Sequence, residues 1–149
     1  MEASEALRQA LGGYRAPTLA DVNELARYHC DFHVQSFDGL RLVVVGSFDL
    51  CYYHGLELHF VEVARIDCPV RFHNPTFADE GPVSAHDGSA AGPRRYAIRS
   101  DEGAHTILAG SVEIVFGTVY YYDRGAALKS GERIAPWVKR AKTEPAPAT

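Results

Sequence analysis

Apolar and polar residues alternate along much of the chain between residues 32 and 122. In the segment RIDCPVRF, residues 65–72, the apolar side chains share one phase, while arginine, aspartate and proline occupy the other. Successive side chains of a strand point to opposite faces of a sheet, so this period of two predicts a strand with one buried face. The phase expected to be buried together consists of Ile66, Cys68, Val70 and Phe72.

Seven segments are rich in β-branched and aromatic residues and are predicted to be strands. They are residues 32–37, 40–53, 56–63, 65–72, 95–100, 106–109 and 111–122. Asp38-Gly39 and His54-Gly55 have the composition of tight turns, so neighbouring strands are expected to pair as antiparallel hairpins. Gly46 and Gly117 interrupt two long strands, which indicates a bulge or a bend where the sheet curls.

Helical periodicity precedes the strand-rich region. Residues 3–11 are predicted to form a short helix that ends at Gly12 and Gly13. In the next segment Thr18 can cap the sequence LADVNELARY, and Asp21 stands three residues further on, as in a capping box. We therefore predict an α+β fold in which one or two N-terminal helices pack on a curled, mostly antiparallel β-sheet, forming a sandwich or a partly open barrel.

One globular domain is expected over residues 1–136, because 46% of the 149 residues are hydrophobic, which is enough for a single core. Residues 74–94 are rich in Gly, Pro, Ser and Ala and are predicted to be a flexible insertion without a packed element. Residues 137–149 form a polar, basic tail that is expected to be partly disordered. Trp137 is the exception, since its indole ring is expected to dock on the domain.

Charge is distributed unevenly along the chain. Residues 1–123 hold 17 Asp and Glu against 9 Arg, a net charge of −8, whereas residues 124–149 hold 6 basic and 2 acidic groups, a net charge of +4. An acidic body repels phosphate backbones and attracts basic partners by long-range steering. The protein is therefore expected to bind a basic protein and no nucleic acid, although a solubilising surface charge is the simpler explanation.

No feature of the chain predicts a membrane or a secretory route. The first eight residues carry Glu2 and Glu5 in place of a basic and then apolar signal, and apolar runs such as residues 42–45 are too short to span a bilayer. We expect a soluble, cytoplasmic protein. Its three cysteines, Cys30, Cys51 and Cys68, are odd in number and are expected to be reduced and largely buried.

Histidines provide the candidate metal chemistry. If residues 28–33 are extended, His29, Asp31 and His33 project from one face, and His59 or His54 can supply a fourth ligand for zinc, iron or manganese. The alternative is an ordinary polar strand face. Glycine-rich phosphate loops and Cys-x-x-Cys pairs are absent, so no cofactor is predicted, and neither Cys51 nor Ser47 stands in a nucleophile motif.

Tyrosines are the candidate binding residues, because exposed tyrosines anchor protein interfaces. Cross-strand aromatic packing is the alternative. Body carboxylates are included because they would meet a basic partner. The predicted binding set is Tyr52, Tyr53, Tyr120, Tyr121, Tyr122, Glu57 and Glu62.

The segments YHCDFHVQSFDG, GLELHFVEVARIDCP, YAIRS and SVEIVFGTVYYYD follow a short helical lead. In this pattern, over residues 28–123, the chain resembles small β-rich bacterial domains of the uncharacterised and immunity-protein type. The resemblance implies a sheet scaffold whose variable face binds and blocks a partner toxin, and it assigns a role to no individual residue. We expect a protein-binding module, most concretely an immunity or inhibitor protein that occludes a basic toxin or enzyme. The alternative is a small metal-dependent enzyme, or a small-molecule-binding protein, with a pocket inside the curled sheet.

Overall fold

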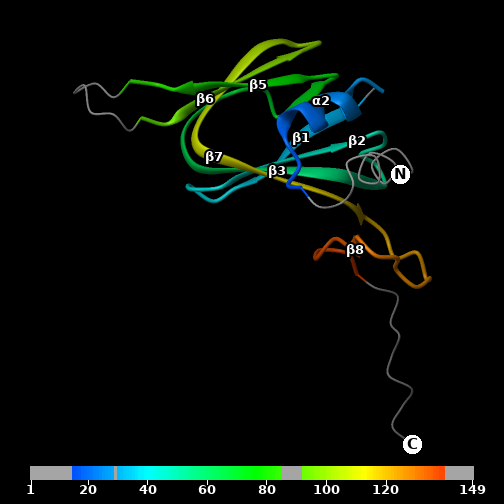
Figure 1. The fold of residues 1–149 in the computed structure, drawn as a ribbon. Coiled ribbons are helices and arrows are strands. Elements are labelled where there is room, and N and C mark those ends of the chain that lie inside the picture. Colours follow the sequence, from blue (N-terminus) through cyan, green and yellow to red (C-terminus); the bar gives the residue numbers. More distant parts are fainter. Residues whose placement is uncertain (1–14, 29, 85–91, 140–149) are drawn as a thin grey trace, which may run out of the picture.

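The computed structural model describes residues 15–28, 30–84 and 92–139. In this part of the chain, one helix, α2 (Leu19–Ala26), packs on a single curled sheet (Figure 1). The strands are β1 (Asp31–Phe37), β2 (Leu42–Ser47), β3 (Tyr53–Asp67), β4 (Arg71–His73), β5 (Thr76–Pro82), β6 (Arg94–Ser100), β7 (Gly103–Tyr120) and β8 (Glu132–Ile134). Their order is β4-β1-β2-β3-β7-β6-β5, and β8 pairs with β7. The predicted α+β fold with a curled, mostly antiparallel sheet is confirmed, and among the described strands only β7 and β8 pair in parallel.

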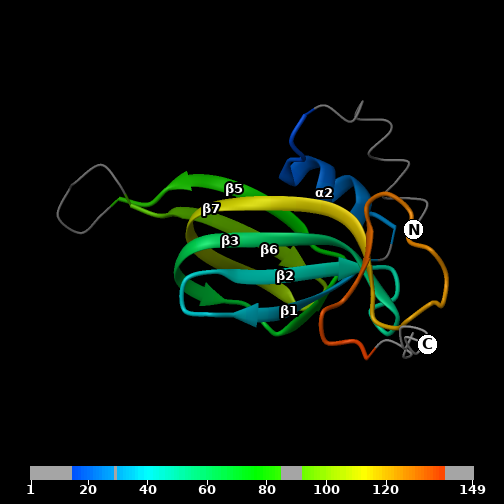
Figure 2. The same ribbon diagram turned by 90° about the horizontal axis from the view of Figure 1, so that it is seen from below.

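Two long strands make the sheet curl into a half-barrel (Figure 2). β3 has 15 residues and β7 has 18, and they pair along almost their whole length. Both bend where Glu62 faces Gly110: Glu62 has a positive φ of 56°, and a Cβ on Gly110 would lie 3.2 Å from that of Glu62. The first half of β3 therefore lies in one layer with β1 and β2, and its second half lies in the other layer with β6 and β5.

This bend corrects the prediction of separate strands. Residues 56–63 and the beginning of 65–72 belong to one continuous strand, as do residues 106–109 and 111–120. The predicted turn at His54-Gly55 is also wrong, because both residues lie in β3. The predicted strand 40–53 ends at Ser47, and the chain turns over residues 48–52 before β3 begins. The turn at Asp38-Gly39 lies between β1 and β2, as predicted.

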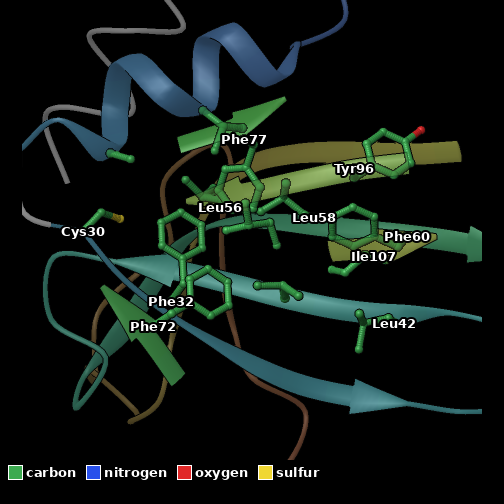
Figure 3. Packing of buried hydrophobic residues seen from close by; sticks show 14 of the residues in the cluster. Cys30, Phe32, Leu42, Leu56, Leu58, Phe60, Phe72, Phe77, Tyr96 and Ile107 are labelled. Carbon is green, nitrogen blue, oxygen red and sulfur yellow. The ribbon is translucent and has the colours of Figure 1, made fainter. Parts of the chain in front are cut away.

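The concave face of the sheet carries the core. Phe32 stacks on Phe72 with ring centroids 5.7 Å apart, and Phe77 lies 5.4 Å from Phe32. Figure 3 shows Phe77 directly under α2, with Phe32 and Phe72 below it. All three rings are at most 2% exposed, so they close the core on the side that the helix covers.

The two strand glycines have different roles. Gly46 stays in regular register between Phe32 and Leu56, and a Cβ at this position would lie 2.6 Å from the Phe32 ring. Gly46 therefore allows a close approach, and the bulge predicted there is absent. Gly117 does mark a bulge, as predicted: its φ is 153°, and the β3–β7 register shifts beside it, between His54 and Leu56.

The helix α2 is built as its sequence predicts. Thr18 and Asp21 form a complete capping box, which satisfies backbone N–H groups at the start of the helix. Arg15 adds two hydrogen bonds of 3.0 Å to the Asp21 carboxylate. The helix buries Val22 and Leu25 against the sheet. The helix predicted over residues 3–11 lies outside the described residues.

An asparagine of this helix protects the free edge of β5. Asn23 donates from Nδ2 to the carbonyl oxygen of Phe77 at 2.8 Å and accepts from the Phe77 amide at 2.7 Å. The side-chain amide thus takes the place of a neighbouring strand at this residue. Unpaired edges promote unwanted strand pairing, and here the hydrogen bonds also attach α2 to the sheet.

β5 lies inside the stretch that was predicted to be a flexible insertion. Over Thr76–Pro82 that prediction is wrong, because this segment pairs with β6 and buries Phe77. The composition of this segment did not predict a strand, because the strand is stabilised by pairing with β6, which begins at Arg94. Residues 85–91, at the centre of the predicted insertion, are outside the described part of the chain.

The predicted burial of residues 66–72 is correct only at its end. Phe72 is fully buried, but Ile66 is 36% exposed, Val70 is 65% exposed and Cys68 is half-buried. The reason is that β3 ends at Asp67 and the chain turns before β4, so the alternation continues through residues that belong to no single strand.

Replacement of Phe72 by alanine should lower the free energy of unfolding by about 3 to 5 kcal/mol, the usual cost of removing a large aromatic ring from a core. Val70→Ala is the matched control from the same sequence pattern, and it should cost less than about 0.5 kcal/mol because its side chain is already in water. Urea denaturation of both variants tests this. Equal losses would contradict the burial described here.

Candidate functional site

An ionised carboxylate lies buried on the outer face of the sheet. Leu56 and Leu58 of β3 point into the core, so Glu57 and His59 point outward. An outward-facing residue is usually solvated, yet Glu57 is only 7% exposed, and His54, which contacts it, is 1% exposed. The cause is the C-terminal segment around β8, which lies at this end of the sheet (Figure 1) and brings Arg133 to Glu57.

A continuous chain of hydrogen bonds passes through this carboxylate. Tyr121 donates from its hydroxyl to Nδ1 of His54 at 2.6 Å, and Nε2 of His54 donates to Glu57 Oε2 at 2.7 Å. Arg133 also donates to Oε2. On the other oxygen, Nε2 of His59 donates to Oε1 at 2.8 Å. We call this set, with Arg41 and Glu113 described next, the Glu57 network.

Arg41 completes the Glu57 network on the β2 side. Its Nη1 lies 3.1 Å from Nδ1 of His59 and 3.1 Å from Oε2 of Glu113. A guanidinium can only donate, so Nδ1 of His59 accepts and the proton of the neutral ring is on Nε2. The same tautomer suits His54, whose Nδ1 accepts from Tyr121. Both imidazoles are therefore held in one defined tautomer.

The pKa values of the network follow from its geometry. Burial raises the pKa of Glu57, but the hydrogen bonds from His54 and His59 and the charge of Arg133 outweigh it and lower the pKa to about 2. Burial, together with the negative charge of Glu57, raises the pKa of Tyr121 to about 12. Near neutral pH the carboxylate is thus ionised and the phenol is protonated, which matches the donor and acceptor roles described above.

The Glu57 network is closed. In the described part of the chain, every fully buried side-chain nitrogen and oxygen has a hydrogen-bond partner. A network whose buried members are all hydrogen-bonded rigidifies a structure and specifies one arrangement. What the network holds in place is the C-terminal segment, because Arg133 belongs to β8 and Tyr121 directly follows β7.

Five aromatic residues gather where β7 ends and β3 begins, and we call them the aromatic end: Tyr52, Tyr120, Tyr121, Tyr122 and Trp137. Tyr122 packs edge-on against Tyr52 at 6.2 Å and against Tyr120 at 5.8 Å. Trp137 lies 5.5 Å from the ring of Tyr121, which is the docking surface expected for it. Tyr121 also connects its own pair with Trp137 to the other three rings, since its backbone amide donates to the carbonyl oxygen of Tyr52 at 2.8 Å.

Three of these rings remain in water. Trp137 is 58% exposed, Tyr52 is 59% exposed and Tyr122 is 44% exposed. Tyr120 is buried and donates its hydroxyl to Glu132. The aromatic end therefore presents large apolar rings that other rings hold in fixed orientations.

The remaining predicted binding residues divide into three groups. Tyr53 and Tyr121 are half-buried, Glu57 is buried inside its network, and Glu62 is exposed at the bend of β3. Arg133 and Arg41 were not predicted as members of the site. The hydrogen bond between Tyr121 and His54 was not predicted either, because the two residues are 67 positions apart.

The predicted metal ligands do not converge in the described residues. His54 and His59 of β3 both form hydrogen bonds with Glu57. Asp31 of β1 instead lies 3.8 Å from His73 of β4. In the described ranges no group of three or more His, Cys, Asp and Glu residues is placed to hold a metal ion. His29 lies outside those ranges, so the predicted set that contains it stays a prediction.

In the described part of the chain, neither Cys51 nor Ser47 forms a hydrogen bond with a histidine. Cys30 is buried and Cys68 half-buried, as expected, but Cys51 is exposed in the turn after β2. Burial, with a smaller effect of the Asp31 charge, raises the pKa of the Cys30 thiol to about 12. Ser47 is buried and accepts a hydrogen bond from the amide of Asp49.

Glu57→Gln tests the network through the pH dependence of stability. The pKa of Glu57 falls from 4.5 to about 2 on folding, so its stabilising effect is complete above pH 4.5 and is lost as the pH falls toward 2. The effect corresponds to about 3 kcal/mol. Denaturation at several pH values should show a large difference between wild type and variant at pH 6 that nearly vanishes near pH 2.

The control for this measurement is Glu113→Gln, which removes an exposed carboxylate of the same network. Its ion pair with Arg41 is solvated, so the variant should lose less than about 1 kcal/mol at any pH. A constant difference between wild type and Glu57→Gln from pH 6 to pH 2 would contradict the lowered pKa.

Comparison with known proteins gave no match: no family model, curated protein or solved structure matches the chain. Within the described ranges, no helix is both long enough and apolar enough to cross a membrane. Function therefore has to be inferred from the arrangement of the side chains.

Proposed function

We propose that this chain is a protein-binding module and that its contact surface is the aromatic end. The observation that carries this proposal is the exposure of Tyr52, Tyr122 and Trp137 at one end of the sheet. Tyrosine and tryptophan are the residues most enriched among the energetic anchors of protein interfaces. Five Phe, Tyr and Trp rings of the described chain are exposed, and three of these five lie at this one end.

Packing among the rings supports the same proposal. Each exposed ring rests on another aromatic ring, and the Glu57 network fixes Tyr121, on which Trp137 rests. Side chains that are already ordered lose less conformational entropy on binding. A partner would therefore gain the burial of these rings at a reduced entropic cost.

The partner that we propose is a basic protein. The body of the chain carries a net charge of −8, and Asp49 is exposed in the same turn as Tyr52. Two nearby cations are already engaged: Arg124 lies over the Tyr120 ring at 4.7 Å, and Arg133 is bound to Glu57. Long-range attraction would raise the association rate, while the aromatic anchors would slow dissociation.

The most specific form of this function is an immunity or inhibitor protein. In that form the aromatic end occludes the basic active-site cleft of a toxin or enzyme. An acidic chain that offers rigid aromatic rings has the complementary chemistry for such a cleft. Nucleic acid is a poorer partner, because strand binding combines stacking rings with a basic groove.

The first test is capture of the partner with the full-length chain from a lysate of its native host. The captured protein is identified, purified and used for affinity measurements. Trp137→Ala and Tyr52→Ala should each weaken binding about tenfold or more. Phe37→Ala is the control, because this ring is 49% exposed but lies near the β1–β2 turn, at the opposite end of the strands.

Two results would contradict the proposal. One is a partner whose affinity is insensitive to Trp137→Ala and Tyr52→Ala. The other is recovery of nucleic acid or a small ligand without any protein. Thermal unfolding of each variant shows whether a loss of binding comes from a loss of folding.

The charge component is tested by association kinetics with the same partner. Rising salt should slow association more than it changes dissociation, because screening acts mainly on the long-range encounter. Asp49→Lys, at the aromatic end, should slow association more than Glu62→Lys or Glu80→Lys, which change the net charge equally at distant exposed positions. Equal slowing in all three variants would mean that only net charge matters and that the contact surface lies elsewhere.

A further inference from the structure

The second layer of the half-barrel has an outer face with a different chemistry. Tyr96 and Ile98 of β6 point into the core and are at most 2% exposed, so the residues between and beside them point outward. The outward positions on β6 are Arg95, Ala97 and Arg99, and Arg65 of β3 lies on the same face. We call the surface around Arg65, Arg95 and Arg99 the arginine face.

Strand register brings these three arginines near one another. Leu108 of β7 pairs with Arg65 on one side and with Arg95 on the other, which places their Cα atoms about 10 Å apart across the three strands. Arg99 stands four residues along β6, about 13 Å from Arg95. Leu108 stands between Arg65 and Arg95, and the smaller Ala97, Ala104 and Thr106 lie toward Arg99.

The arginines of this face differ from most others in the described chain. Six described arginines form salt bridges with carboxylates: Arg15, Arg27, Arg41, Arg94, Arg124 and Arg133. Arg65, Arg95 and Arg99 are exposed and have no carboxylate partner among the described residues. Carboxylates outnumber cations in this chain, yet these three guanidinium groups on one surface form no ion pair among the described residues.

We propose that the arginine face is a second interaction surface and that it binds an acidic protein. Guanidinium groups form directed hydrogen bonds with carboxylates, and arginine is enriched at protein interfaces. The three groups share one face of neighbouring strands, so a single partner can contact all of them. This surface is independent of the aromatic end and lies on the other layer of the half-barrel.

The carboxylates near the arginine face favour an acidic protein over a nucleic acid as its partner. Asp67 follows Arg65 on the same face, since it pairs with Thr106, and Asp101 and Glu102 are exposed in the turn next to Arg99. A continuous phosphate backbone would place charge against these carboxylates. A folded protein can instead place its own acidic groups opposite the arginines and other groups opposite Asp67.

The experiment measures binding of fluorescently labelled poly-L-glutamate to the full-length chain at low salt. Replacement of Arg65, Arg95 and Arg99 together by glutamine should weaken binding about tenfold or more. The control triple variant replaces Arg27, Lys129 and Lys139 by glutamine, which removes the same charge from exposed positions at the end of α2 and in the C-terminal segment. It should change the affinity less than about threefold.

A single-stranded DNA of equal charge is measured in parallel, and it should bind more weakly than poly-L-glutamate. The proposal is overturned if poly-L-glutamate does not bind, or if both triple variants lose affinity equally. Tighter binding of the DNA, lost only in the variant of Arg65, Arg95 and Arg99, would also overturn it and would identify a phosphate-binding surface. Thermal unfolding confirms that each variant is folded.

Discussion

The pairing of β3 with β7 is the constraint on which the rest of the structure depends. Among the described strands these two alone belong to both layers, and their common bend at Glu62 and Gly110 curls the sheet into a half-barrel. The bend also divides β3 into two functional parts. Before it, the outward residues of β3 form the Glu57 network, and after it they include Arg65 of the arginine face. Neither surface would have its present neighbours if the two strands ran straight.

Local features of the fold could be predicted from the sequence, whereas long-range ones could not. The capping box of Thr18 and Asp21 and the turn at Asp38-Gly39 depend on residues within four positions of one another, and both are present. β5 was missed because its stability comes from β6 and from the side chain of Asn23, 54 residues away from Phe77. Alternation alone likewise misjudged Val70, since burial depends on where a strand ends.

The candidate site shows the same limit. Tyr52 and Tyr122 were predicted as binding residues because exposed tyrosines anchor interfaces, and both side chains are exposed. Glu57 was predicted to face a partner, but the outward direction of a strand residue does not reveal what covers it. Here Arg133, 76 residues further along the chain, covers it and neutralises its charge. A buried ion pair gives little net stability compared with apolar packing, so its value lies in fixing the C-terminal segment, and with it Trp137, in one place.

Net charge describes this protein poorly because the fold sorts its charges. The body total of −8 includes arginines that are neutralised by a carboxylate in contact and arginines that have no such partner. A paired arginine contributes little to the electrostatic potential close to the surface, because the carboxylate in contact cancels its charge. The unpaired arginines therefore make the local potential positive. At low ionic strength the total charge steers the encounter at long range, whereas in contact each face acts through its own side chains. An acidic chain can therefore attract a basic partner to its aromatic end and still offer a basic surface on its other layer.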